Sequence, residues 1–348
     1  MFYFFIVVLC FLVALILTPL VKKLAFLIGA TDQPNKRKIH TGIMPRLGGL
    51  AIIGSFTVGM VIYHPHTHFK WPMLIGALLI VLIGIVDDIY PLSARYKFIV
   101  QFIAAFIVVL NGVEMTFINL PFGYTLEFGY LSIPITVLWI VGITNAINLI
   151  DGLDGLAGGV STIALLTIAG LAIMLGDPFV ATIAFMLAGG TLGFLVFNFY
   201  PAKIFMGDTG ALFLGYMIGV LSVLGFKNAT LFSLIVPIAI LGVPIIDTLF
   251  AIVRRAAYKK PLYAPDKLHL HHCLLNLGFS HRQTVILIYA MSGLFSVAAI
   301  LFSRSVMWGS TLLFFLVTIL VELLIELTGL IGNDYRPLLN AISRHYRK

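Results

Sequence analysis

Long apolar runs, separated by short polar loops, are the feature that most limits how this chain can fold. Apolar residue types make up 60% of its 348 residues and charged residues only 10%, with a mean hydropathy of +1.07. A chain this apolar needs lipid as its main solvent, and each helix needs roughly 20 apolar residues to cross the hydrocarbon layer. Because the alternating pattern of a membrane barrel is absent, we expect an all-α polytopic membrane protein.

Eleven apolar runs bounded by charge, proline or glycine are candidate spans. They lie near residues 2–21, 46–63, 72–87, 97–112, 131–149, 157–175, 179–197, 210–225, 230–253, 284–303 and 306–328. No internal repeat or low-complexity tract divides the chain, so residues 1–348 are expected to form a single integral-membrane domain. The stretch from Phe117 to Tyr130, with its proline, glycine and alternating aromatic residues, predicts a short hairpin.

The basic residues predict how these spans are oriented. Of the 22 Lys and Arg, 19 lie in loops after odd-numbered spans, in the C-terminal tail or at the span ends beside them, and the other side holds Lys70, Lys227 and Arg304. The positive-inside rule therefore places the N-terminus outside and the C-terminus in the cytoplasm. The same rule accounts for the net charge of +8 without nucleic acid as a partner.

Two polar clusters end predicted spans on the cytoplasmic side. In VDDIYPLSARYK, Asp87 and Asp88 are adjacent carboxylates at a membrane boundary, a costly arrangement unless a cation such as Lys97 partners them. In NAINLIDGLDGLAGG, Asn145, Asn148, Asp151 and Asp154 recur every three residues, which on a helix would keep them roughly on one face. A helix cap would explain one of these acids but not the set.

Two further clusters follow in predicted cytoplasmic loops. Asp208, between Gly207 and Thr209, suits either a helix N-cap or a ligand of Mg²⁺, which takes one or two protein oxygens. His269, His271 and His272 lack the additional ligands of a zinc site, and nearby cations such as Arg254 make a phosphate site the better interpretation. Together the clusters predict phosphoryl transfer at the membrane surface.

The roles of several other polar residues stay open. Asp247, inside the ninth predicted span, is either a functional acid or a structural partner for a neighbouring helix or loop. Glu322 and Glu326 have no assigned role. His64, His66 and His68 alternate in a loop on the exterior side, where the simplest interpretation is that they are solvated.

The four clusters, in this order, resemble the polyprenyl-phosphate N-acetylhexosamine-1-phosphate transferase family over nearly the whole chain. The segments PNKRKIH and MPRLGG and the interrupted His-Leu-His-His are similar to the branch that uses UDP-N-acetylglucosamine (UDP-GlcNAc), which includes initiators of wall teichoic acid linkage units. The peptidoglycan branch, which uses UDP-MurNAc-pentapeptide, shows a contiguous histidine triplet and a PTMGG segment instead.

The resemblance implies a bacterial plasma-membrane enzyme that transfers GlcNAc-1-phosphate from UDP-GlcNAc to undecaprenyl phosphate and releases UMP. It implies that Asp208 and Asn148 ligate Mg²⁺, with Mn²⁺ as an alternative metal. Asp87 or Asp88 would deprotonate or orient the lipid phosphate. The substrate-binding residues would be Arg46, Lys97, Asn145, Asp151, Asp154, Arg254, His269, His271 and His272.

Two alternatives remain: the phospho-MurNAc-pentapeptide transferase of peptidoglycan synthesis, and a secondary transporter of an anionic solute. A transporter would need ionisable residues near the bilayer midplane, whereas here they gather at one face. The sequence leaves the polyprenol length, the downstream polymer and homodimer formation open.

Overall fold

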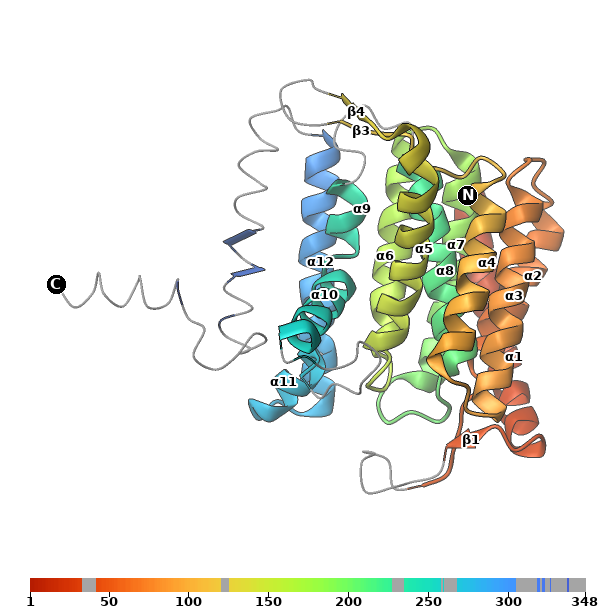
Figure 1. Cartoon of the computed structure of the whole chain (residues 1–348). Coiled ribbons are helices and arrows are strands. Elements are labelled where there is room, and N and C mark those ends of the chain that lie inside the picture. Colours follow the sequence, from red (N-terminus) through yellow and green to blue (C-terminus); the bar gives the residue numbers. More distant parts are fainter. Residues whose placement is uncertain are drawn as a thin grey trace.

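The computed structural model is a bundle of long helices (Figure 1). It describes residues 1–32, 42–119, 125–226, 235–257, 259 and 268–304, and a few single positions beyond them. The helices are α1 Phe2–Leu27, α2 Gly49–Tyr63, α3 Lys70–Ile89, α4 Ala94–Val109, α5 Ser132–Ile150, α6 Leu156–Met174, α7 Pro178–Asn198, α8 Gly207–Phe226, α9 Ile235–Ile240, α10 Gly242–Ala257, α11 Leu270–Asn276 and α12 His281–Arg304.

Two short antiparallel strand pairs lie at opposite ends of this bundle (Figure 1). Strands β3 Phe117–Asn119 and β4 Thr125–Glu127 form the predicted hairpin, which is confirmed. Strands β1 Thr31–Asp32 and β2 Met44–Pro45, which were not predicted, pair at the other end of the bundle, the end at which α11 also lies (Figure 1).

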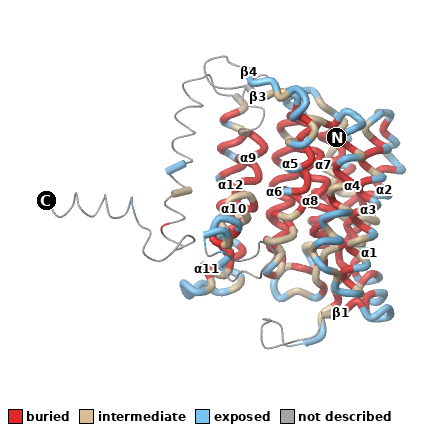
Figure 2. Tube along the Cα trace, in the orientation of Figure 1, coloured by how far each residue is buried: buried red, intermediate tan, exposed pale blue. Residues whose placement is uncertain are grey.

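Helix α8 is the centre of the bundle, and most of its residues are buried (Figure 2). It packs against α2, α3, α5 and α6. Close approach at its first turn depends on small residues: a Cβ on Gly84 of α3 would lie 2.6 Å from the Cα of Thr209, and the backbones of Gly49 and Gly210 are in direct contact. Small residues at helix contacts are typical of membrane bundles, because they let backbones approach closely.

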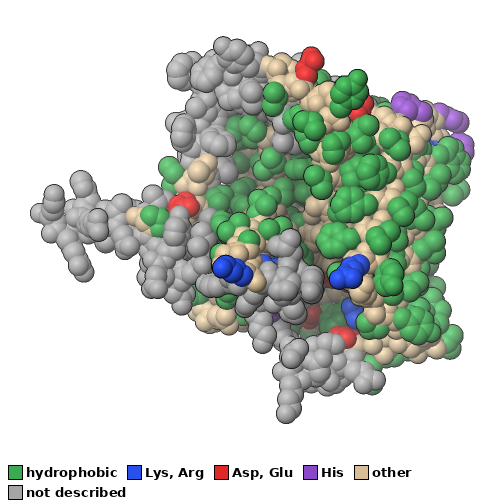
Figure 3. Space-filling model, viewed as in Figure 1, with side chains coloured by type: hydrophobic (Ala, Val, Ile, Leu, Met, Phe, Trp, Pro, Cys, Tyr) green, Lys and Arg blue, Asp and Glu red, His purple; other side chains and the backbone are tan. Residues whose placement is uncertain are grey.

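The outside of the bundle is apolar, in contrast to the surface of a water-soluble protein. Figure 3 shows hydrophobic side chains over most of the visible helical surface. On α1 alone, Phe4, Leu12 and Ile16 are about half exposed or more. A continuous exposed apolar surface of this kind needs a lipid partner, so the molecule is a multi-pass membrane protein.

Seven helices in the described part of the chain are long and apolar enough to cross a membrane. They are Phe2–Leu27, Lys70–Ile89, Gly129–Ile150, Leu156–Met174, Pro178–Asn198, Gly207–Phe226 and His281–Ser303. Helices α2 and α4 match predicted spans in position but have only 15 and 16 residues. The mostly helical membrane fold is therefore confirmed, whereas eleven spans remain a prediction; the eleventh, 306–328, falls almost wholly outside the described residues.

The ninth predicted span, residues 230–253, is interrupted in its described part. The chain forms α9 and α10 there, with a turn at Leu241 between them. Pro244 has no amide hydrogen to donate to the carbonyl of Ile240, so a helix running through Leu241 would lose a backbone hydrogen bond. Proline is tolerated in a first helical turn, and Pro244 is the third residue of α10.

Candidate active site

The acidic clusters meet at one end of the bundle, where α3 and α5 end and α8 begins. Asp88, near the end of α3, is buried and accepts three hydrogen bonds from the start of α8. They come from the amides of Asp208 and Thr209, at 2.9 and 3.0 Å, and from the Thr209 hydroxyl, at 2.6 Å. A carboxylate there satisfies free amides and complements the helix dipole, so Asp88 acts as an N-cap supplied by a neighbouring helix.

Asp87 faces a different partner from its neighbour. One of its carboxylate oxygens accepts from the Leu92 amide at 2.7 Å, and the other lies 3.3 Å from Nζ of Lys97. The same ammonium is 2.7 Å from Oδ2 of Asp208. Lys97 therefore joins the predicted acid pair to the third acid, as a cation shared by two carboxylates.

Asn148 and Asp151 bring the end of α5 to the same place. Asn148 Nδ2 donates to Oδ1 of Asp208 at 3.3 Å. Asp151 lies just after α5, and its amide donates to the Asn148 carbonyl at 3.3 Å, but its carboxylate has no hydrogen-bond or ion-pair partner among the described residues. Burial, with the negative charges of Asp208 and Asp88, raises the pKa of Asp151 to about 7. The cluster thus carries negative charge that its own cations do not fully offset.

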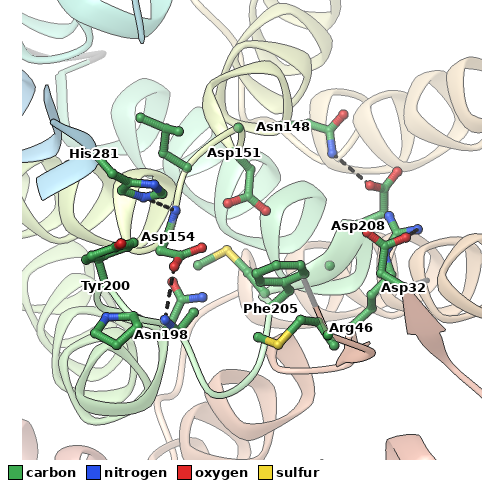
Figure 4. Close-up of a pocket in the computed structure, with 18 of the residues that line it drawn as sticks. Asp32, Arg46, Asn148, Asp151, Asp154, Asn198, Tyr200, Phe205, Asp208 and His281 are labelled. Carbon is green, nitrogen blue, oxygen red and sulfur yellow. Dashed lines mark hydrogen bonds and ion pairs between the residues drawn. The ribbon is translucent and has the colours of Figure 1, made fainter. Parts of the chain in front are cut away.

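A cavity of about 640 Å³ opens beside this cluster (Figure 4). A volume of that order suits a ligand the size of a nucleotide or nucleotide sugar. Its lining residues come from distant parts of the chain: Asp32, Gly42, Met44, Arg46, Asn148, Asp151, Gly152, Leu153, Asp154, Asn198, Tyr200, Pro201, Ala202, Phe205, Met206, Gly207, Asp208, His272 and His281.

Arg46 supplies positive charge to one wall of this cavity. It follows β2, and its amide donates to the carbonyl of Ala30 at 3.1 Å. Its guanidinium nitrogens lie 3.9 Å from Asp32 and 3.7 Å from Asp88, distances too long for strong hydrogen bonds. The planar donor set of Arg46 is therefore available to an anionic group in the cavity.

Asp154 organises the opposite wall, together with residues that the sequence analysis missed. Its Oδ2 accepts from the Ala202 amide at 3.0 Å, and its own amide donates to Nε2 of His281 at 3.0 Å. The His281 ring stacks on Tyr200, with 4.4 Å between ring centroids (Figure 4). Phe205 also lines the cavity, so this wall offers aromatic faces as well as polar groups.

His281 could have been predicted from its neighbours. The Ser280 amide donates to Gln283 Oε1 at 2.9 Å, and the Gln283 amide donates to Ser280 Oγ at 3.4 Å. This reciprocal pair is a capping box, which is visible in the sequence as Ser-x-x-Gln. It fixes His281 in the first turn of α12, at the end of the bundle where the acids gather.

The histidine cluster lies beside the cavity, with one member in its lining. Nδ1 of His269 is 2.8 Å from Oδ2 of Asp247, and the Leu270 amide donates to Oδ1 of the same carboxylate at 2.7 Å. Of the two interpretations left open for Asp247, the structure supports a structural partner, here for a loop. His271 packs over Gly152, and burial, aided by the charge of His272, lowers its pKa to about 3, so its ring is neutral.

The structure therefore brings together most of the predicted site residues, but not all in the same role. Residues Arg46, Asn148, Asp151, Asp154, Asp208 and His272 line the cavity. Asp87, Asp88 and Lys97 contact Asp208 without lining it. His269 and His271 are buried beside the cavity, and Arg254 is buried on α10, also outside the lining.

Asn145 lies outside this arrangement. Its amide nitrogen donates to Gln101 of α4 at 2.6 Å and to the Val141 carbonyl at 2.7 Å. The expected single face fails because α5 ends at Ile150, so Asp151 and Asp154 leave the helix and the three-residue spacing no longer aligns them with Asn145.

The donor chemistry of the cavity fits a hard divalent cation. Asp208 and Asn148 are in contact, and the carboxylate of Asp151 lines the same cavity. In the described part of the chain, no group of three or more His, Cys, Asp or Glu is arranged to hold a metal. A Mg²⁺ ion there would rest on one or two protein oxygens, which is its usual habit where substrate phosphates complete its shell.

The site is thus a polar, acid-rich cavity at one end of a bundle of apolar helices, in a multi-pass membrane protein. Residues 70–226 match the model of glycosyl transferase family 4. The chain is 48% identical, over 94% of its length and 92% of the relative's, to the probable undecaprenyl-phosphate N-acetylglucosaminyl 1-phosphate transferase of Bacillus subtilis. The protein therefore belongs to glycosyl transferase family 4.

More distant relatives carry similar names. The decaprenyl-phosphate N-acetylglucosaminephosphotransferase of Mycolicibacterium smegmatis is 35% identical, over 89% of this chain and 84% of its own. The undecaprenyl-phosphate alpha-N-acetylglucosaminyl 1-phosphate transferase of Salmonella typhi is 28% identical, over 80% and 78%. These alignments include all four polar clusters, because each covers at least four fifths of the chain.

Proposed function

We propose that this protein transfers GlcNAc-1-phosphate from UDP-GlcNAc to undecaprenyl phosphate, giving undecaprenyl-diphospho-GlcNAc and UMP. The observation that carries the proposal is the Asp87–Lys97–Asp208 cluster, which adjoins a nucleotide-sized cavity at the end of a lipid-exposed bundle. A lipid acceptor cannot leave the bilayer and a nucleotide sugar cannot enter it, so the reaction needs a site where the two phases meet. The names of the relatives support the same donor and acceptor classes.

The chain's own residues would position charge rather than form bonds. An oxygen of the lipid phosphate attacks the β-phosphorus of UDP-GlcNAc, and the bond from that phosphorus to the bridging oxygen breaks, so that UMP leaves with the bond electrons. Lys97 and Arg46 would neutralise phosphate oxygens on either side of the cluster. Because a phosphomonoester is largely ionised near neutral pH, Asp87 would orient the acceptor rather than need to deprotonate it.

Mg²⁺ would be the cofactor, held by Asp208 and Asn148. When bound, it supplies charge neutralisation for the diphosphate. Asp151 would stay close to the metal and adjust the local charge. Asp154 and the aromatic wall of Tyr200, Phe205 and His281 would hold the nucleoside part of the donor, since planar bases stack on aromatic rings.

The finer topology and biological role belong to the same proposal. Eleven spans would place the N-terminus outside and the cavity at the cytoplasmic face of the bacterial plasma membrane, because the basic residues gather on that side. The segments MPRLGG and His-Leu-His-His favour UDP-GlcNAc over UDP-MurNAc-pentapeptide, and wall teichoic acid as the downstream polymer.

The test is UMP release by the purified protein from radiolabelled UDP-GlcNAc. Release should require both undecaprenyl phosphate and Mg²⁺, and UDP-MurNAc-pentapeptide supplied in parallel should not be turned over. Asp208→Asn should abolish release. Asp177→Asn is the matched control, because Asp177 caps α7 at the other end of the bundle and asparagine also caps helices. Turnover without lipid phosphate, or full activity in Asp208→Asn, would refute the proposal.

A further inference from the structure

A second polar pocket, of about 400 Å³, lies in the loop between α2 and α3. It is lined by His64, Pro65, His66, Thr67, His68, Lys70 and Trp71. Lys70 begins the 20-residue helix whose other end carries Asp87, so the pocket and the acid cluster are about 26 Å apart along α3. This pocket is therefore at the opposite side of the bundle from the candidate active site.

Lys70 is the unusual member of the pocket. Its side chain lines the cavity, yet the residue is only 9% exposed. Its ammonium lies 5.2 Å from the ring centroid of Trp71, and no carboxylate pairs with it anywhere in the described part of the chain. An ammonium at the mouth of a pocket, held on a largely buried side chain without a carboxylate partner, favours an anion supplied from outside the chain.

The three histidines strengthen the preference for an anion. The ring centroids of His64 and His66 lie 5.1 Å apart, and the His68 ring contacts the Phe69 ring at a tilt of 45°. Imidazoles donate N–H groups when neutral and carry positive charge when protonated. A metal ion is disfavoured, because the Lys70 ammonium would repel it and the pocket lining includes no acid.

The position of the pocket selects the source of the anion. Trp71 is 65% exposed beside the ammonium, and tryptophan is enriched where membrane meets water. In Figure 3 histidine side chains gather at the upper right edge of the molecule, next to the apolar surface. A phosphate held at that level is most simply the headgroup phosphate of a membrane lipid.

We propose that this pocket binds the phosphate group of an anionic lipid headgroup, with Lys70 as the central contact and His64, His66 and His68 as surrounding donors. The site is separate from the transfer reaction. Because Lys70 is the first residue of α3, a bound headgroup would hold that end of the helix at the membrane surface.

Native mass spectrometry of the delipidated, purified protein tests the proposal. The protein is titrated with phosphatidylglycerol, with neutral diacylglycerol and with inorganic phosphate as a competitor. Lys70→Met should weaken phosphatidylglycerol binding about tenfold, the loss expected for one charge-assisted contact. Lys70→Arg should retain it. Lys23→Met is the matched control, because it removes an equal charge near the C-terminal end of α1, away from the pocket.

Several outcomes decide between the sources and the alternatives. If phosphatidylglycerol binds and inorganic phosphate displaces it, the contact is with the headgroup phosphate. If inorganic phosphate binds but phosphatidylglycerol does not, the lipid assignment is overturned. Equal affinities in Lys70→Met and Lys23→Met would overturn the site. If Lys70→Met does not fold, the triple variant His64→Gln, His66→Gln, His68→Gln must lose affinity instead. Stoichiometric zinc binding that this triple variant abolishes would show a metal site in place of an anion site.

Discussion

Replacing Asp88 by asparagine should destabilise the protein far more than the same change at the adjacent Asp87. Asp88 accepts two amide hydrogen bonds and one hydroxyl hydrogen bond at the buried start of α8. An asparagine keeps one acceptor oxygen, and its NH₂ group then faces an amide that also donates. One buried donor left unpaired costs about 1–3 kcal/mol, and losing the charge at a helix N-terminus adds roughly 0.3–1 kcal/mol.

The expected loss for Asp88→Asn is therefore about 1–4 kcal/mol. Asp87→Asn should lose less than about 1 kcal/mol, because asparagine can still accept from the Leu92 amide and Lys97 keeps its shorter contact with Asp208.

Thermal unfolding in detergent, followed by tryptophan fluorescence, measures both variants under the same conditions. The unfolding midpoint of Asp88→Asn should fall by several degrees below that of Asp87→Asn, whereas UMP release should fall in Asp87→Asn without a matching loss of stability. Equal midpoints for the two variants would refute the N-cap role assigned to Asp88.

Three further changes probe the remaining walls of the site. Lys97→Met should lower kcat about 100-fold, as measured by UMP release, because it removes the cation between two carboxylates; an unchanged kcat would remove Lys97 from the reaction. The raised pKa of Asp151 means that the folded state holds its proton more tightly than the unfolded chain, so stability is lost as pH rises from about 4 to about 7. Asp151→Asn should therefore be up to about 4 kcal/mol more stable than the parent at pH 8 and similar to it near pH 4; parallel pH–stability curves would contradict this. His281→Phe should raise the KM for UDP-GlcNAc about tenfold by removing the acceptor for the Asp154 amide, whereas Arg282→Gln, at the next position, should not.

The sequence predicts the positions of most helices because the bilayer leaves the backbone few alternatives. In lipid every amide must be satisfied within the chain, so a long apolar run becomes a helix, as α1 and α5 to α8 show. Hydropathy alone does not show where a helix is interrupted inside an apolar run, as it is at Leu241, three residues before Pro244. It also misses α11, since seven residues in a polar loop carry little periodic signal.

The sequence points to the acids of the candidate site but not to its aromatic wall of Tyr200, Phe205 and His281, and only partly to its geometry. Acids at the same end of neighbouring helices lie at a similar depth in the bundle, and here Asp87 and Asp208 share the ammonium of Lys97. Their spacing in the sequence does not tell which of two adjacent carboxylates turns toward the helix start. That distinction depends on the φ of +73° at Gly207, where a side chain would collide with Asp88 and the carbonyl of Arg46.

The pairing of Asp247 with His269 is a contact that hydropathy cannot predict. Asp247 lies inside an apolar helix and is 1% exposed, so its charge needs a partner. The partner comes from a segment 22 residues later that has no apolar pattern of its own, and it supplies both an imidazole and the Leu270 amide. Two hydrogen bonds to one buried carboxylate fix the start of α11, and this places His271 over Gly152 and His272 in the cavity wall. Asp247, an unusual acid inside an apolar helix, therefore binds the segment that positions the histidine cluster beside the site.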